Sequence, residues 1–303
     1  MQLTFLGTGG GMPSLQRSVS SLALTHSQCG DTWLFDCGEG TYLQYMRSLL
    51  KLGRISKIFI THLHGDHIFG LPGMITSRSM GGIIQPLTLY GPKGIKLFMD
   101  TALLLSSSHI NYPLEIIEIE AGLVLNDRAF RVSAWPLVHS IHCFGYRIEQ
   151  HDKPGFLDAA RLQEDGVPRG PWYKHLKEGE TVTLEDGRVI KGMDYLGPVI
   201  KGKTLAIFGD TAPTPIALQL AANVDLMVHE ATLEASLQDK ANKHGHSTTL
   251  QAVQVAKEAG VKRMIATHFS SRYMLSDMPR LLEECRSVFP NTQLAYDLAV
   301  FTL

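Results

Sequence analysis

The chain has 303 residues, 44% of them hydrophobic, and a formal net charge of −1. This length and composition suffice for a large buried core, either as one domain or as one domain with a sizeable insertion. The balanced charge excludes a protein that binds polyanions through its overall charge, so any contact with nucleic acid has to come from a local patch.

Short apolar segments with β-branched residues predict strands at residues 3–6, 19–25, 32–36 and 57–60. The glycine-rich residues 7–11 follow the first strand, and we interpret them as a tight turn that brings the backbone close to a substrate. They do not form a G-x-G-x-x-G loop, because Met12 occupies the place of the last glycine. Helical spacing follows over residues 41–50.

The middle of the chain is predicted to alternate helices and strands before it changes character. One helix is expected to start at residues 71–73, and another follows Gly94 and runs through Ser106. Strands are expected at residues 86–90, 114–119, 130–135 and 144–148. Residues 151–203 contain proline–glycine clusters and a hairpin signal at residues 181–189, which indicate an insertion. Two sheets with helices outside are predicted once the C-terminal elements are added: strands at residues 204–208, 225–228, 263–267 and 293–301, and helices at residues 248–259 and 278–288.

Four potential metal ligands follow the strand predicted at residues 57–60: His62, His64, Asp66 and His67. Side chains alternate in an extended segment, so His62 and His64 are expected to point the same way. A turn at Gly65 would then direct the other two ligands toward the same point. Imidazole and carboxylate together suit zinc or a similar divalent ion.

Three further ligand types follow predicted strands elsewhere in the chain: His139, Asp210 and His268. Strands that each end in a ligand can build a shared site at the rim of a fold. His142 competes with His139 for the same role. Seven ligands are too many for one tetrahedral zinc but suffice for two ions if a carboxylate bridges them. The positive charge that remains would attract a phosphodiester.

A proton donor is expected just before the helix at residues 248–259, where His244 and His246 both lie. Either imidazole could protonate a leaving group, and Glu230 could orient it. The spacing alone leaves this choice open.

The four cysteines, Cys29, Cys37, Cys143 and Cys285, are scattered and form no C-x-x-C pair. This spacing argues against a zinc ribbon and favours reduced, mostly buried thiols. The sequence shows neither a signal-peptide pattern nor a membrane-spanning apolar run, so we expect a cytoplasmic protein with no membrane partner.

The ligand pattern His62-x-His64-x-Asp66-His67, followed by His139, Asp210 and His268, resembles the metallo-β-lactamase superfamily. Other motifs narrow the resemblance to its ribonuclease Z family over essentially the whole chain: Phe5-Leu6-Gly7-Thr8-Gly9, Phe69-Gly70-Leu71-Pro72-Gly73, His229-Glu230-Ala231-Thr232, His246-Ser247-Thr248 and Thr267-His268-Phe269-Ser270. The resemblance implies an α/β (α+β) fold over residues 1–303. This is an αββα sandwich of two mixed β-sheets with helices on the outer faces.

The resemblance also implies roles for the candidate residues. One zinc would be held by His62, His64 and His139, and a second by Asp66, His67 and His268, with Asp210 as the bridge. Asp66 would also help to activate the attacking water. His246, paired with Glu230, would protonate the leaving 3′ oxygen. Manganese or another divalent ion can share such ligands.

The insertion at residues 151–203 corresponds in this resemblance to a flexible arm, an exosite that binds the body of precursor tRNA. Gly170 and Pro171 match the arm's glycine–proline motif. The arm as a whole is not basic, since residues 151–198 hold seven Lys or Arg against nine Asp or Glu. A local group, Arg169, Lys174 and Lys177 around Trp172 and Tyr173, is interpreted as a patch that contacts phosphates and stacks on bases. The resemblance further implies a homodimer in which each arm serves the partner's active site.

The loop after Gly11 departs from the family pattern. Members carry an Arg-Asn pair there, whereas this chain keeps Arg17 and has Ser18 in place of asparagine. The resemblance implies that this loop contacts the 3′ region of tRNA. Arg17 is therefore expected to bind substrate, and the change at Ser18 calls discrimination against mature CCA ends into question.

The combined inference is a zinc-dependent endonuclease that removes the 3′ trailer from precursor tRNA and leaves a 3′ hydroxyl. One alternative keeps the metals but acts on small phosphodiesters or other small esters, and such a substrate does not need the insertion. Another alternative is a non-catalytic RNA-binding module with a structural metal. The complete donor pair, Glu230 and His246, argues against this second alternative.

Overall fold

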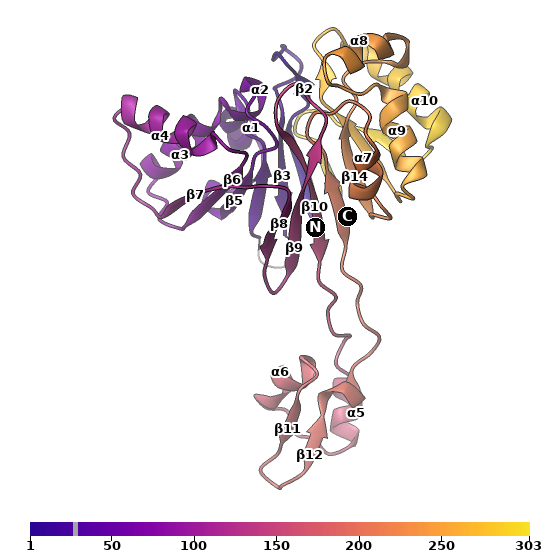
Figure 1. Ribbon diagram of the computed structural model, residues 1–303. Coiled ribbons are helices and arrows are strands. Elements are labelled where there is room, and N and C mark those ends of the chain that lie inside the picture. The colour runs from indigo at the N-terminus through magenta and orange to yellow at the C-terminus, as the bar shows by residue number, and fades with distance from the viewer. Residues whose placement is uncertain (27–29) are drawn as a thin grey trace. The chain divides into compact units, whose positions relative to one another are not determined.

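The computed structural model describes residues 1–26 and 30–303 and divides them into two compact units (Figure 1). Residues 1–126, 132–148 and 204–303 form the larger unit, and residues 127–131 and 149–203 form the smaller one. The expectation of reduced, buried thiols is confirmed for Cys37, Cys143 and Cys285, whereas Cys29 lies outside the described residues.

The strands form two seven-stranded sheets, which correspond to the two predicted sheets. The first has the order β18 (Val300–Thr302), β1 (Gln2–Gly7), β3 (Ser21–Thr25), β4 (Thr32–Phe35), β5 (Ile55–Phe59), β6 (Leu87–Gly91) and β7 (Leu114–Glu118). The second has the order β17 (Thr292–Leu294), β15 (Met264–Thr267), β14 (Leu226–Glu230), β13 (Thr204–Ile207), β10 (Cys143–Gln150), β9 (Phe130–Leu137) and β8 (Gly122–Asn126).

Aromatic side chains pack the space between the two sheets. The ring centroids of Phe35 and Phe59 in the first sheet lie 5.1 Å apart, and Tyr146 of the second sheet lies 5.8 and 5.4 Å from them. Because side chains alternate along a strand, the neighbouring Leu34 and Ile58 face the opposite side of the first sheet. There they belong to the core beneath the helices.

Helices cover the outer face of each sheet, which confirms the predicted αββα sandwich (Figure 1). Those on the first sheet are α1 (Thr41–Arg47), α3 (Leu71–Met80) and α4 (Ile95–Leu105), and those on the second are α7 (Pro215–Leu220), α9 (Thr249–Glu258) and α10 (Met278–Val288). Thr248 caps α9, because its Oγ1 accepts from Gln251 N while the Gln251 side chain accepts from Thr248 N. In the described part of the chain, no helix combines the length and apolar composition that crossing a membrane requires.

Two predictions about local structure were wrong, and one strand was not predicted. The single strand expected at residues 293–301 is two strands, β17 and β18, which belong to different sheets. A bend separates them, in which Leu298 has a φ of 65°. The glycine-rich turn contains a short strand, β2 (Gly9–Gly10), that pairs in parallel with β16 (Phe269–Ser270). Strand β8 had no counterpart in the prediction.

The smaller unit has a core of its own, formed by Leu162, Val167, Leu176, Leu184 and Ile190. The predicted hairpin is present as β11 (Thr181–Thr183) and β12 (Val189–Lys191), which pair antiparallel. Two short helices that the sequence patterns did not indicate, α5 (Ala159–Glu164) and α6 (Trp172–Lys177), complete this unit.

Candidate metal centre

The histidine-rich motif begins just after β5 and continues into a short helix rather than a turn. His64 precedes α2 (Gly65–Ile68), so Gly65 is the first residue of a single helical turn. A Cβ atom at Gly65 would lie 2.2 Å from the Phe69 ring. Glycine is therefore needed at this position because of close packing, and not because of an unusual backbone angle. The helical turn carries Asp66 and His67 back toward the preceding histidines.

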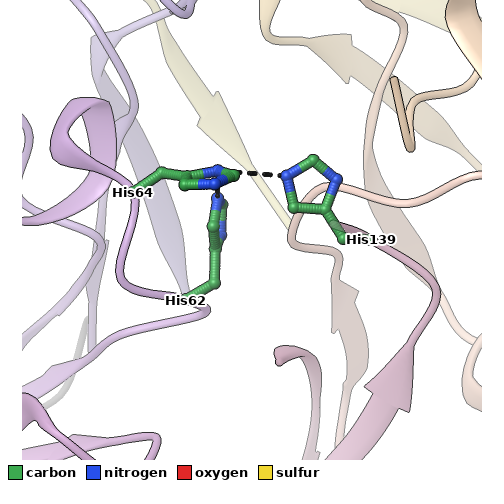
Figure 2. Close-up of side chains that lie close together, drawn as sticks. All are labelled: His62, His64 and His139. Carbon is green, nitrogen blue, oxygen red and sulfur yellow. Dashed lines mark hydrogen bonds between the residues drawn. The ribbon is translucent and has the colours of Figure 1, made fainter. Parts of the chain in front are cut away.

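Three imidazoles form the first ligand group, which we call the His62 triad: His62, His64 and His139. Figure 2 shows the His62 and His139 rings both directed at the His64 ring. His64 Nδ1 lies 3.1 Å from His62 Nε2 and 3.1 Å from His139 Nε2. His139 follows β9, so both sheets contribute to this group. The competing residue, His142, is exposed to solvent.

A carboxylate and two imidazoles form the second group, which we call the Asp66 triad: Asp66, His67 and His268. Asp66 Oδ2 lies 3.5 Å from His67 Nε2 and 3.5 Å from His268 Nε2. Both Nε2 atoms are buried and lack a hydrogen-bond partner. A buried nitrogen without a partner is costly, and coordination of a divalent ion would satisfy both atoms.

Asp210, which follows β13, lies between the two triads. Its Oδ2 is 3.7 Å from His62 Nε2 and 3.9 Å from His139 Nε2 in the first triad. The same atom is 3.5 Å from His67 Nε2 and 3.3 Å from His268 Nε2 in the second. One carboxylate therefore reaches ligands of both groups, as a bridge between two ions requires.

The protonation preferences of this cluster fit a bound cation. Burial alone would raise the pKa of Asp66, but the adjacent His268 and His67 imidazoles lower it well below its usual range, so the carboxylate is ionised. Burial alone would lower the pKa of His67, but Asp210 and Asp36 raise it well above its usual range. The carboxylates thus favour a positive charge at this site. A divalent ion supplies such charge.

Two residues that support the ligands were not singled out from the sequence. Asp36 Oδ2 lies 2.7 Å from His67 Nδ1 and also accepts from the Thr61 hydroxyl. Thr232 Oγ1 lies 2.9 Å from His268 Nδ1. Such contacts orient the imidazoles of a metal site. Asp36 directly follows β4, so its position at a strand end could have indicated it.

Glu230 pairs with His246 rather than with His244, the other candidate for the predicted proton donor. His246 Nδ1 lies 3.1 Å from Glu230 Oε1, whereas His244 is exposed. The buried Glu230 carboxylate also accepts from the Ser247 N–H and the Thr232 hydroxyl, so its orientation is constrained. Burial lowers the pKa of His246, but Glu230 more than offsets this and raises it to about 9. The protonated ring is the form that can donate a proton.

Arg17 does not fit the expected role in RNA binding. Its side chain is buried, and one guanidinium nitrogen donates to Thr8 Oγ1 and to the Ala295 carbonyl. The guanidinium also lies 5.0 Å from the centre of the Phe269 ring. Arg17 therefore holds the loop after Gly11 against the C-terminal segment.

Strand β2 and the residue that follows it, Gly11, lie against the Asp66 triad. Gly11 N donates to Asp66 Oδ2 at 2.7 Å. A Cβ atom at Gly10 would lie 2.5 Å from the His268 ring. This close approach explains why glycine is required beside His268.

We expect Gly10→Ala to displace the His268 ring and lower zinc affinity by roughly 10-fold or more. Equilibrium titration with a zinc indicator measures this effect without relying on activity. Gly73→Ala is the matched control, because the structure shows open space around Gly73 within α3. Equal zinc affinity in the two variants would contradict the prediction.

In the smaller unit, the predicted substrate-binding residues differ in exposure. Arg169, Lys174 and Lys177 are exposed. Gly170 and Pro171 lie just before α6, and the Trp172 ring lies so close to Gly170 that a Cβ atom there would be 2.5 Å from it. The predicted stacking residues, Trp172 and Tyr173, are only partly exposed and pack against the core of the unit.

Comparisons with known proteins place the chain in a family. Residues 1–108 match the family described as "Anti-Pycsar protein Apyc1", and residues 179–269 match "Beta-lactamase superfamily domain". Ribonuclease BN of Erwinia tasmaniensis is 60% identical over 302 residues, which cover 99% of each chain. Ribonuclease BN of Escherichia coli K12 is 55% identical over 305 residues, which cover 100% of each.

A solved structure agrees with these relatives. The crystal structure of human tRNase Z, short form (ELAC1), is 31% identical and has a TM-score of 0.72. The match covers 100% of this chain and 99% of the human one. The chain therefore belongs to the ribonuclease BN group of the ribonuclease Z family, within the metallo-β-lactamase superfamily.

Proposed function

We propose that this chain is a zinc-dependent endoribonuclease that cuts precursor tRNA after the discriminator nucleotide and releases the 3′ trailer. The observation that carries the proposal is the position of Asp210 between two ligand triads, beside the pair of His246 and Glu230. Identity of 60% to ribonuclease BN and 31% to human tRNase Z supports the same activity.

The His62 triad would hold one zinc ion and the Asp66 triad the other, with Asp210 shared between them. When bound, the two ions would polarise the scissile phosphate and make the attacking water more acidic. Manganese is an alternative occupant, because it accepts the same imidazole and carboxylate ligands. Metal analysis of purified protein, with about two zinc ions expected per chain, tests this assignment.

The side chains of this protein would perform the proton transfers. Asp66 would take the proton of the attacking water, and its hydrogen bond from Gly11 N holds the carboxylate in place. As the bond between phosphorus and the 3′ oxygen breaks, His246 would give that oxygen a proton. Glu230 stabilises the protonated imidazole and keeps it oriented. The products are a tRNA with a 3′ hydroxyl and a trailer with a 5′ phosphate.

Incubation with a 5′-labelled precursor tRNA tests the proposal. We expect one cut after the discriminator nucleotide in the presence of zinc, a 3′ hydroxyl on the labelled product, and loss of cleavage after chelation. A second precursor that carries CCA would measure the effect of Ser18 on discrimination. Absence of cleavage with every divalent ion tested would refute the proposed function.

We also propose a homodimer. Large apolar side chains are exposed on and beside α1 and α3, namely Leu43, Met46, Leu49, Phe69 and Met80. Helices α1 and α3 contact each other, so these side chains lie on neighbouring elements. An apolar surface of this kind is typical of a protein interface. Light scattering should give twice the 33.4 kDa mass of the chain, and a monomeric mass would contradict the proposal.

We propose a cytoplasmic location. The free thiols of Cys37, Cys143 and Cys285 are typical of a reducing compartment, and precursor tRNA would be available there. Cell fractionation with an antibody against the chain tests this, and recovery outside the cytoplasmic fraction would contradict it.

A further inference from the structure

Two pockets border the metal centre, and they differ in charge. The first, which we call the cationic pocket, has a volume of about 310 Å³ and includes Lys240, His244 and Arg272 together with the donor His246. The second, which we call the Glu39 pocket, has a volume of about 400 Å³ and includes the carboxylates of Glu39 and Asp66. Its lining contains no lysine or arginine.

The positive charges of the cationic pocket have no acidic partner in the described residues. Lys240 lies in α8 (Gln238–Lys243), and Arg272 follows β16. Both side chains are exposed, neither makes an ion pair among residues 1–26 and 30–303, and no Asp or Glu lines the pocket. Some surface cations elsewhere are paired, as Lys262 is with Asp225. Two unpaired cations beside a candidate active site favour an anionic ligand.

The position of His246 assigns a direction to the bound RNA. His246 would protonate the 3′ oxygen that leaves phosphorus, so the nucleotide that carries this oxygen has to lie on the His246 side of the metal centre. The cationic pocket opens on that side, because His246 is part of its lining. The preceding phosphate of the same strand lies one nucleotide farther from the scissile bond.

We propose that Lys240 and Arg272 bind the phosphate on the 5′ side of the discriminator nucleotide, the last phosphodiester that remains in the tRNA product. This inference rests on the proposed function. It places the tRNA side of the cut in the cationic pocket, and the Glu39 pocket is left for the trailer side.

A neutral linkage in the substrate tests the proposed contact. The variants are Lys240→Ala, Arg272→Ala and the double variant of the full chain, each loaded with zinc. One precursor tRNA is unmodified, and another carries a single methylphosphonate in place of the phosphate 5′ of the discriminator nucleotide. We expect each single variant to lower kcat/KM on the unmodified precursor by about 10-fold. The slope of log(kcat/KM) against log salt concentration should also become shallower by about one.

On the methylphosphonate precursor, the same variants should lose less than about 2-fold, because the charge that they contact has already been removed. A precursor with the methylphosphonate in the trailer, one linkage beyond the cut, is the substrate control, and the 10-fold loss should persist there. Lys257→Ala is the protein control, because Lys257 is an exposed lysine of α9 outside the pocket, and its kcat/KM should equal that of the wild type.

Each contrary outcome has a separate meaning. If the wild type cleaves precursor tRNA and the variants match it, or if they lose equally on all three precursors, the proposed contact is wrong while the proposed function stands. If the wild type fails to cleave any precursor, the proposed function itself is wrong. Thermal unfolding and zinc content of the variants should equal those of the wild type, which distinguishes a lost contact from a damaged fold.

Discussion

Asp66→Ala should lower the rate of precursor tRNA cleavage by at least about 10³-fold. Two losses combine in this variant. The carboxylate that lies 3.5 Å from both His67 Nε2 and His268 Nε2 disappears, which leaves the Asp66 triad with two ligands. The group proposed to take the proton of the attacking water disappears as well. Zinc content should fall from about two ions per chain to about one.

Single-turnover cleavage of a labelled precursor and metal analysis measure these two effects separately. Asp66→Asn keeps an oxygen ligand but removes the charge, so it should retain more zinc than the alanine variant and remain slow. Asp100→Ala is the control, because Asp100 is an exposed carboxylate on α4 whose partner is Lys96. Cleavage by Asp66→Ala at the wild-type rate would show that the proposed mechanism is wrong.

Removal of most of the smaller unit should impair cleavage of precursor tRNA but not hydrolysis of a small phosphodiester. Lys153 and Ile200 pair as an antiparallel bridge, so a short glycine linker can replace residues 154–199 without stretching the chain. The larger unit has its own cores and should still fold. We expect kcat/KM for precursor tRNA to fall by at least about 10²-fold, because binding energy from remote parts of the substrate is lost.

A small phosphodiester such as bis(p-nitrophenyl) phosphate is the matched substrate for this deletion. Its turnover should stay within about 3-fold of the wild type, because all seven proposed metal ligands lie in the larger unit. Equal loss on both substrates would argue against an exosite. Unchanged tRNA cleavage would favour the alternative that the active site alone selects its substrate.

Much of the candidate site could be predicted from local sequence. His62, His139, Asp210 and His268 each follow a strand that short-range apolar patterns identify, and strand ends gather at the rim of the sheets. Periodicity also predicted α9 and α10 to within a residue or two at each end. These features depend on neighbours in the chain, which is why they can be read without the fold.

The burial of Arg17 could not be predicted from local sequence. A cation in a polar loop resembles a substrate-binding residue, but its burial depends on packing against Thr8, Ala295 and Phe269. The predicted strand at residues 293–301 failed for a related reason. The chain bends there, and Asp297 Oδ2 accepts from Ser18 N. A contact between residues so far apart in the chain cannot be predicted from the pattern of hydrophobic residues around either of them.

The sequence by itself determined the kinds of metal ligand, the two-sheet architecture and the family, because each depends on residue types at short, recognisable spacings. Only the tertiary structure decided which side chains support the ligands. Asp36 lies 31 positions from His67, and Thr232 lies 36 from His268. The fold also decided that Lys240 and Arg272 line one pocket with His246. Packing of the whole chain sets such long-range contacts, and no local pattern encodes them.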